Sequence, residues 1–508
     1  MIRIATTAWL GLAALAPLAA QAQSQPPSLP NLRIALREDP DILDPTLSRT
    51  YVGRIVYMGV CDKLFDINER LEAVPQLATG YSWDDPVTLT IRLREGVRFH
   101  DGEMMDAEAV RYSLNRHLTM QGSFRRGEMG NITAIEVVDP LTVRLRLGAP
   151  NASLIATLTD RAGMIVSPKA AEAAGRNFGT RPICAGPFRF TERVAQDRIV
   201  LDRFPQYWDA ARIHFNRVTY LSIPDNNVRL ANIQSGAAEL GERMEPDDLR
   251  AIQRNRNLRG VAVDELGWQS IQFNVNNGPR SEGLLRDPRV RRAFELAIDR
   301  AAINQVVYEG MFTPTRQPIP PASGFHLANF APPARDVTRA RALLREAGIT
   351  APLPLEFTIP NNPDLRQVGE VVQSMAREAG FDITLRAMEF ASSLQAAQRG
   401  DFQLYLVGWS GRTDPDGNIH AFMHSRGGQN DGKYSNPEVD RLLDAARLES
   451  DVAKRRDLYR QALEIAVAQD AGRLFVWHRK NIMIHSTRLQ GYRPIADGMI
   501  RLQDMRLN

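Results

Sequence analysis

Residues 353–388 decide the fold class, and they read LPLEFTIPNNPDLRQVGEVVQSMAREAGFDITLRAM. The pattern predicts a strand over Leu353–Ile359, a helix over Leu365–Ala379 that ends at Gly380, and a second strand over Phe381–Met388. An order of strand, helix and strand is typical of an α/β domain with a largely parallel sheet.

The flanking sequence continues this alternation. Asp287 and Pro288 cap and open a long predicted helix, which Gly310 stops. Phe402–Val407 is a continuous apolar run, which suits the centre of a sheet, and the sequence is strand-like again from Arg473 onward. Further helices are predicted over Asp336–Ala347, Pro437–Leu448 and Val452–Ala468.

The first half of the chain reads mainly as β structure with helical insertions. Apolar and polar residues alternate over residues 89–93 and 143–147, which predicts half-buried strands. Between them, a helix is predicted over Asp106–His117, with Asp106 as its cap.

Composition excludes several classes of protein. Of the 508 residues, 44% are hydrophobic and 24% are charged, which is enough apolar side chain for a core and excludes a disordered chain. The net charge is only +4, and cations alternate with anions, so we expect no nucleic-acid partner. A single short apolar run excludes a polytopic membrane protein.

That apolar run lies within residues 1–22, and this segment has the three parts of a secretory signal peptide. It begins with the cation Arg3, continues as an apolar stretch, and ends in Ala20-Gln21-Ala22, whose small residues fit a cleavage site before Gln23. We expect export and cleavage after Ala22; a membrane anchor or a buried helix is the alternative. The sequence has two cysteines, Cys61 and Cys184, which in an oxidising compartment form one disulfide or stay as two buried thiols.

Several segments resemble catalytic or metal-binding motifs but lack a required residue. Gly408–Arg412 has arginine where a nucleophile elbow needs glycine, and residues 427–434 end in Tyr434 where a phosphate loop needs Ser or Thr. His420 and His424 lack the glutamate of a zinc protease, and residues 414–418 depart from a calcium loop. We therefore expect no catalytic residues, no metal and no cofactor.

Eight segments, in order along nearly the whole chain after the leader, together resemble the family 5 extracellular solute-binding proteins, the peptide- and nickel-binding group that serves ABC importers. They are LREGVRFHDG (93–102), PICAGPF (182–188), Tyr207-Trp208, Phe273-Asn274, DPRVRRAFELAIDR (287–300), LLREAG (343–348), Gly408-Trp409 with Asp414-Pro415, and YSNPEVD (434–440).

The resemblance implies an α/β, two-lobed periplasmic-binding-protein fold that closes on its ligand about a hinge. Lobe I would comprise residues 31–278 and 482–508, with an inserted subdomain at about 65–185, and lobe II would comprise residues 279–481. The two crossovers between the lobes are expected near Phe273–Gly278 and His478–Ile484. Ligand contacts on both lobes would shift the equilibrium towards the closed state.

The resemblance also points to ligand-binding residues, with one departure. In peptide-binding members of the family, an aspartate three residues after the tryptophan that matches Trp409 pairs with the α-amino group of the ligand. In this sequence that position is Arg412. A guanidinium suits a carboxylate or phosphate, so we expect an acidic group on the ligand, with Asp414 available for an amine. The alternative is that Arg412 pairs with Asp414 or Asp416.

Other candidates are an aromatic wall and residues of lobe I. Trp409 would stack on the ligand or pack within the sheet. Residues expected to face the cleft, with core packing as the alternative, are Tyr51, Arg54, Trp268 and Asn274.

These observations predict the periplasmic, monomeric substrate-binding component of an ABC importer, which delivers a peptide-like or acidic amino-acid or sugar-acid solute to permease subunits in the inner membrane. An exported hydrolase with an unrecognised site and an envelope chaperone or scaffold are the alternatives.

Overall fold

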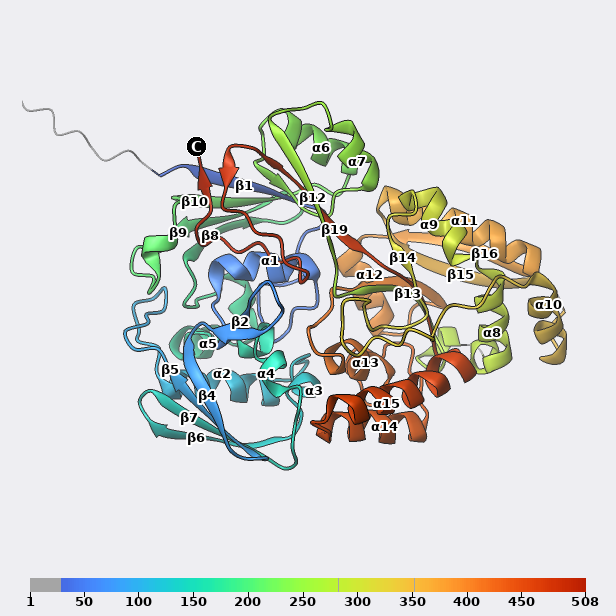
Figure 1. The fold of residues 1–508 in the computed structure, drawn as a ribbon, viewed down its shortest axis with the longest axis horizontal. Coiled ribbons are helices and arrows are strands. Elements are labelled where there is room, and N and C mark those ends of the chain that lie inside the picture. Colours follow the sequence, from blue (N-terminus) through green and yellow to red (C-terminus); the bar gives the residue numbers. More distant parts are fainter. Residues whose placement is uncertain (1–28, 282, 351) are drawn as a thin grey trace, which may run out of the picture.

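The computed structural model describes residues 29–281, 283–350 and 352–508, and Figure 1 shows two lobes side by side. The predicted leader and its cleavage site at Ala22 lie outside the described residues. Within the described ranges, no helix combines the length and the apolar character that crossing a membrane requires.

The first lobe is built on a seven-stranded sheet of order β12-β19-β11-β1-β10-β9-β8. Its strand β1 is parallel to β10 and β11, and the remaining pairs are antiparallel. The buried helix α1 (Tyr51–Val60) packs in the core of this lobe. The strands are β1 (Asn31–Leu36), β8 (Phe188–Val194), β9 (Arg198–Arg203), β10 (Arg217–Ser222), β11 (Leu240–Gly241), β12 (Leu258–Asp264) and β19 (Lys480–Ser486).

A subdomain with its own sheet and its own apolar core is inserted between α1 and β8 (Figure 1, lower left). Its helix α2 (Ala107–Thr119) begins as predicted, because the Asp106 side chain accepts a hydrogen bond from the Ala109 N–H at 2.9 Å. The sheet has the order β4-β5-β7-β6, with β4 (Ala78–Asp85), β5 (Thr88–Leu93), β6 (Ile132–Asp139) and β7 (Thr142–Leu147).

Shorter elements complete the first lobe and its insertion. They are β2 (Phe65–Ile67), β3 (Ala73–Pro75), α3 (Arg126–Met129), α4 (Leu154–Thr157), α5 (Pro168–Ala174), α6 (Asn226–Gln234), α7 (Pro246–Ala251), β20 (Leu489–Gln490) and β21 (Arg506–Leu507).

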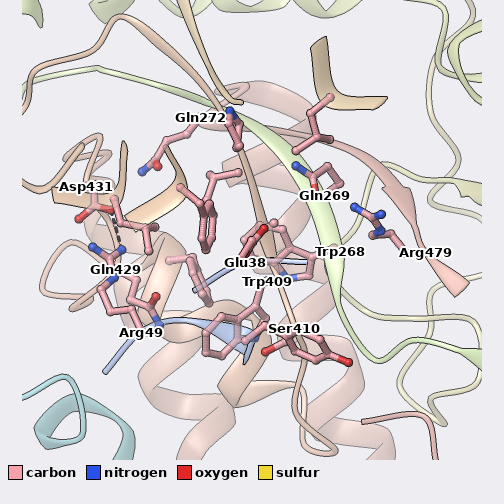
Figure 2. A pocket seen from close by; sticks show the side chains of 18 of the residues that line it. Glu38, Arg49, Trp268, Gln269, Gln272, Trp409, Ser410, Gln429, Asp431 and Arg479 are labelled. Carbon is pink, nitrogen blue, oxygen red and sulfur yellow. Dashed lines mark hydrogen bonds and ion pairs between the residues drawn. The ribbon is translucent and has the colours of Figure 1, made fainter. Parts of the chain in front are cut away.

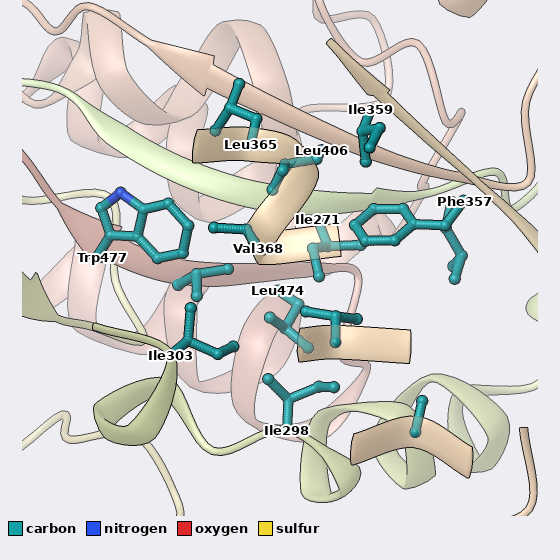
Figure 3. Close-up of a cluster of buried hydrophobic side chains, with 14 of the residues drawn as sticks. Ile271, Ile298, Ile303, Phe357, Ile359, Leu365, Val368, Leu406, Leu474 and Trp477 are labelled. Atoms are coloured by element: carbon teal, nitrogen blue, oxygen red, sulfur yellow. The ribbon is translucent and has the colours of Figure 1, made fainter. Parts of the chain in front are cut away.

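The second lobe contains a six-stranded sheet of order β14-β18-β13-β17-β15-β16. Figure 3 shows side chains of its core, where residues of strands β13, β15, β17 and β18 meet residues of helix α11. The elements are β13 (Trp268–Phe273), β14 (Thr313–Pro314), β15 (Leu353–Pro360), β16 (Phe381–Met388), β17 (Leu404–Trp409), β18 (Arg473–His478), α10 (Val337–Glu346), α11 (Pro363–Ala379), α12 (Phe390–Gln398), α13 (Asp416–Met423), α14 (Pro437–Leu448) and α15 (Val452–Leu463).

The expectation of a largely parallel sheet is wrong for this lobe. Only β15 with β16 and β15 with β17 are parallel, and the pairs that involve β13, β14 or β18 are antiparallel. The predicted strand–helix–strand pattern forms the parallel part. Strands β13 and β18 carry the chain into this lobe and back out, so they run in opposite directions.

The long helix predicted between Asp287 and Gly310 is two helices, α8 (Pro288–Ala297) and α9 (Arg300–Tyr308). Ile298 is extended, and the Asp299 side chain caps α9 by accepting a hydrogen bond from the Ala302 N–H at 2.9 Å. Aspartate is a preferred N-cap residue because its carboxylate satisfies an otherwise unpaired backbone N–H.

The first crossover lies earlier than Phe273–Gly278. The chain leaves the first sheet after Asp264, and β13 already pairs with β17 and β18, so the passage is Glu265–Gly267. A side chain at Gly267 would place Cβ 1.9 Å from the Trp409 carbonyl oxygen, so this passage requires glycine. The return passage is Arg479, between β18 and β19.

A disulfide between Cys61 and Cys184 ties the two ends of the insertion together. Cys61 follows α1 and Cys184 precedes β8, with a Cα–Cα distance of 4.9 Å. Next to it, the Gly186 N–H donates to the Val60 carbonyl at 2.9 Å. The bond therefore fixes the base of the insertion on the first lobe.

Replacing both cysteines by serine should lower the free energy of unfolding by about 4–5 kcal/mol, because the bond closes a loop spanning 123 residues in the unfolded chain. Denaturant titration of the wild type and of Cys61→Ser/Cys184→Ser measures the difference. Two free thiols in the denatured, unreduced wild type would contradict the bond.

Candidate ligand-binding site

A cleft between the two lobes contains an atom-free space of about 740 Å3, part of it open to solvent (Figure 2). The first lobe contributes residues that follow β1 or begin α1, and the second lobe contributes residues of β13, β17 and β18. The charged lining residues are Arg37, Glu38, Arg49, Arg243, Asp431, Arg473 and Arg479, and the aromatic ones are Tyr51, Trp268, Phe390, Trp409 and Phe422.

Two tryptophans form one wall of the cleft. Trp268 and Trp409 are directly paired across β13 and β17. The Nε1–H of Trp268 donates to the carbonyl oxygen of Asn418 at 3.2 Å, and that of Trp409 donates to the Asn418 side-chain oxygen at 3.0 Å. The Phe422 ring packs edge-on against both, at centroid distances of 4.8 and 4.9 Å. The wall is therefore held in place before any ligand arrives.

Arg473 is a buried cation in this cleft, and within the described part of the chain no carboxylate lies within ion-pair distance of it. Its Nη1 donates to Ser270 Oγ at 2.9 Å, and its Nη2 lies 2.9 Å from the amide oxygen of Gln272 when that amide is oriented to accept from its neighbours. Burial lowers the pKa of Arg473 to about 10, so the guanidinium is charged at neutral pH. A guanidinium has five N–H donors, so several remain for a ligand.

Glu38 is the corresponding buried anion. It follows β1, lines the cleft, and has no hydrogen bond or ion pair to any described residue. Burial raises the pKa of its carboxyl, although Arg37, Arg243 and Arg479 oppose that shift. A ligand ammonium beside Glu38 would favour the ionised carboxylate and could donate hydrogen bonds to it.

Three other cations of the cleft, Arg37, Arg49 and Arg243, already have close partners, and two of these pairs cross between the lobes. Arg37 pairs with Asp364 on α11, and Arg49 pairs with Asp431 at 2.8 Å (Figure 2). Arg243 pairs with Glu265 at 2.7 Å, and its guanidinium lies 3.9 Å from the centroid of the Tyr51 ring. The pairs of Arg37 and Arg49 therefore join the two lobes across the cleft.

A third ion cluster joins the lobes beside the cleft. Asp160 of the insertion pairs with Arg54 on α1 at 2.5 Å and with Arg412 of the second lobe at 3.4 Å. Arg54 also donates to Ser410 Oγ at 2.9 Å. Burial alone would raise the pKa of Asp160, but Arg412, Arg54 and Arg161 hold it well below its usual range. Asp160 is therefore ionised and bridges two cations from opposite lobes.

This cluster gives Arg412 a neighbour that sequence reasoning did not consider. Its guanidinium faces Asp160, lies 4.3 Å from the centroid of the Trp409 ring, and is 8% exposed. Burial lowers its pKa to about 9. Asp414, the expected amine partner, instead makes a two-pronged pair with Arg455 at 2.6 and 2.7 Å.

The structure brings Tyr51, Trp268 and Trp409 together at the cleft. Among the described residues, Arg54, Asn274, Arg412 and Asp414 do not line it. Asn274 is fully buried and donates to the backbone carbonyls of three residues, which are Asn277, Gly400 and Phe402.

Sequence reasoning missed Glu38, Arg49, Gln272 and Arg473. A signal existed for Arg473, which precedes the apolar run 474–477 of the buried strand β18, because a charge in a buried strand needs a partner.

Comparison with known proteins identifies the family. The model for the bacterial extracellular solute-binding proteins, family 5 Middle, matches residues 72–430. The chain belongs to this family. It is a substrate-binding protein of the kind that serves ABC importers.

Three similar proteins match along nearly the whole chain. The glutathione-binding protein GsiB of Salmonella paratyphi A is 30% identical over 481 residues, which cover 90% of each chain. The periplasmic binding protein DppA of Helicobacter pylori, solved with the peptide STSA, superposes with a TM-score of 0.87 at 23% identity over 94% of this chain and 98% of the other. The murein tripeptide binding protein MppA of Escherichia coli gives 0.88 at 21% identity, covering 95% and 99%.

If the Arg412–Asp160 pair stabilises the closed state, Arg412→Gln should weaken the binding of every solute by a similar factor. Removing one partner of a buried ion pair costs about 2–5 kcal/mol, which here would oppose closure rather than one ligand group. Calorimetric titration with a panel of acidic and neutral solutes measures the ratio of dissociation constants between the variant and the wild type. Small-angle scattering should show a larger radius of gyration for the variant.

Arg455→Gln is the matched control, because it breaks a buried pair inside the second lobe and should leave closure unchanged. If Arg412→Gln loses affinity for acidic solutes but keeps its affinity for neutral ones, Arg412 binds the ligand directly.

Proposed function

We propose that this protein captures a small zwitterionic, peptide-like solute in the periplasm and delivers it to the permease subunits of an ABC importer. It acts as a monomer and carries out no catalysis. The family supports the transport role, and the cleft chemistry supports the class of solute.

The observation that supports this class of solute is the charge of Arg473, which has no carboxylate partner among the residues that the structure describes. A buried guanidinium without a carboxylate partner is costly, and a ligand carboxylate would supply the missing anion in a two-pronged contact. Glu38 offers the complementary site for an ammonium group. The tryptophan wall between the two lobes offers apolar area for the body of the ligand.

Glutathione is the first ligand to test. The relative at 30% identity is a glutathione-binding protein, and glutathione carries two carboxylates and one ammonium group. This charge pattern fits Arg473 and Glu38, with one carboxylate left for a further donor such as Arg479, which lies at 3.9 and 4.0 Å from its nearest carboxylates. Other acidic short peptides and amino-acid derivatives share the same chemistry.

Closure follows from the same contacts. A ligand held by Arg473 of the second lobe and by Glu38 of the first lobe would bridge the cleft, and it would add to the ion pairs that already cross it. The importer would then recognise the closed, loaded shape.

Replacing Arg473 by glutamine should reduce affinity for the acidic ligand by about 2–5 kcal/mol, because the ligand carboxylate loses its charged partner in a desolvated cleft. Arg473→Lys should recover only part of the loss, since an ammonium cannot reproduce the two-pronged geometry. Calorimetric titration with glutathione, and with its derivatives esterified at each carboxylate, measures these effects.

The matched control is Arg455→Gln, a buried arginine of the same lobe outside the cleft, which should bind glutathione like the wild type. Equal affinity of wild type and Arg473→Gln for every acidic solute that binds would refute the role of Arg473. Turnover of a bound solute would favour a hydrolase, and binding of unfolded chains without a tight small ligand would favour a chaperone.

A further inference from the structure

His420, His424 and Asp444 come together outside the cleft, on the second lobe. His420 lies on α13, His424 directly follows it, and Asp444 lies on α14. One nitrogen from each ring and one carboxylate oxygen all lie within 4.8 Å of one another. None of the three lines the cleft between the lobes.

The two separations between the carboxylate oxygen and the histidine nitrogens match those of donor atoms around a tetrahedral metal ion. Asp444 Oδ1 lies 3.2 Å from His420 Nε2 and 3.4 Å from His424 Nε2. Ligands at about 2.0–2.1 Å from a tetrahedral ion are about 3.3–3.4 Å apart. The two imidazole rings are stacked, with centroids 4.4 Å apart and planes inclined by 16°, so both present a nitrogen to the same carboxylate.

His424 supplies an independent sign of a missing partner. The residue is 1% exposed, and its Nε2 makes no hydrogen bond to any described residue although it lies beside Asp444. A buried polar atom left without a partner is costly, so such an atom calls for a water or an ion.

We propose that His420, His424 and Asp444 bind one divalent transition-metal ion of the class that imidazole prefers, with Zn2+, Ni2+ and Cu2+ as candidates. The site does not depend on the proposed solute, because its three ligands all belong to the second lobe. The three residues also line a hollow together with Gly127, Gly130, Asn131 and Pro150 of the insertion, so a solvent molecule could supply a fourth ligand.

Metal binding also requires a proton rearrangement at His424. Its Nδ1 accepts a hydrogen bond from the Arg426 N–H at 3.0 Å, which places the proton of the neutral ring on Nε2. When Nε2 binds the metal, that proton leaves Nε2 and Nδ1 takes one up, which breaks the hydrogen bond from the Arg426 N–H and turns Nδ1 into a donor 3.8 Å from Asp440 Oδ1. Asp440 would then orient the ring as an outer-shell carboxylate.

A neighbouring cation, Arg426, would lower the affinity of the site for a metal ion but does not block it. Arg426 Nη2 lies 3.7 Å from Asp444 Oδ2 and competes for that carboxylate. The Arg426 side chain is 82% exposed, so it can turn away into solvent when a metal binds.

The test uses the mature protein without a histidine tag, stripped of metal with a chelator and titrated calorimetrically with ZnCl2. The wild type should bind one equivalent, and His420→Ala, His424→Ala and Asp444→Asn should each weaken binding by more than about 100-fold, because even outer-shell partners are worth about 10–100-fold. Asp440→Asn should weaken it by about 10-fold. Bound Co2+ should show the visible absorption bands of a tetrahedral site.

His214→Ala is the control, because it removes a histidine of the first lobe and should leave Zn2+ binding unchanged. Asp444 is 48% exposed, so its substitution should not disturb folding and keeps the test decisive if His424→Ala misfolds. Absence of stoichiometric Zn2+ binding to the wild type, or equal binding by the wild type and Asp444→Asn, would overturn the proposal. Solute affinity is measured separately, so failure of one proposal leaves the other intact.

Discussion

The two passages between the lobes form an antiparallel pair, and this pair constrains the rest of the molecule. Strand β12 pairs with β19 in the first sheet, up to Asp264 opposite Lys480, and β13 pairs with β18 in the second, from Gln269 opposite Trp477. The same two-stranded ribbon therefore runs through both lobes (Figure 1). Along this ribbon only the short links 265–267 and Arg479 lie outside the sheets, so a hinge motion of the lobes would turn about these links.

The contact between the two lobes buries charged side chains. The lobes meet along surfaces that carry Arg37, Arg49 and Arg412 opposite carboxylates of the other lobe. Removing these ions from water is costly, and pairing offsets the cost only while the lobes are closed. Arg473 and Glu38 lack such pairing among the described residues, and a solute with complementary charges would complete the interface.

Local patterns in the sequence predicted many elements because those elements depend on near neighbours. The cap of α2 at Asp106 and the strand Phe381–Met388 are confirmed, since capping and apolar alternation act over a few residues. The break at Asp299 was missed because apolar spacing continues on both sides of it. The sheet of the second lobe is less parallel than predicted, because strand direction depends on how β13 and β18 enter and leave the lobe.

The sequence by itself determined the α/β class and the family resemblance, because local patterns and short contiguous motifs carry them, and it left Trp409 open between a cleft wall and packing within the sheet. Only the tertiary structure decided which charges face the cleft and which pair elsewhere. Arg412 follows the cleft tryptophan by three residues, yet Asp160, 252 positions earlier in the chain, sets its surroundings. The partner of a buried charge is a property of the packed lobes, and residues far apart in the sequence supply it.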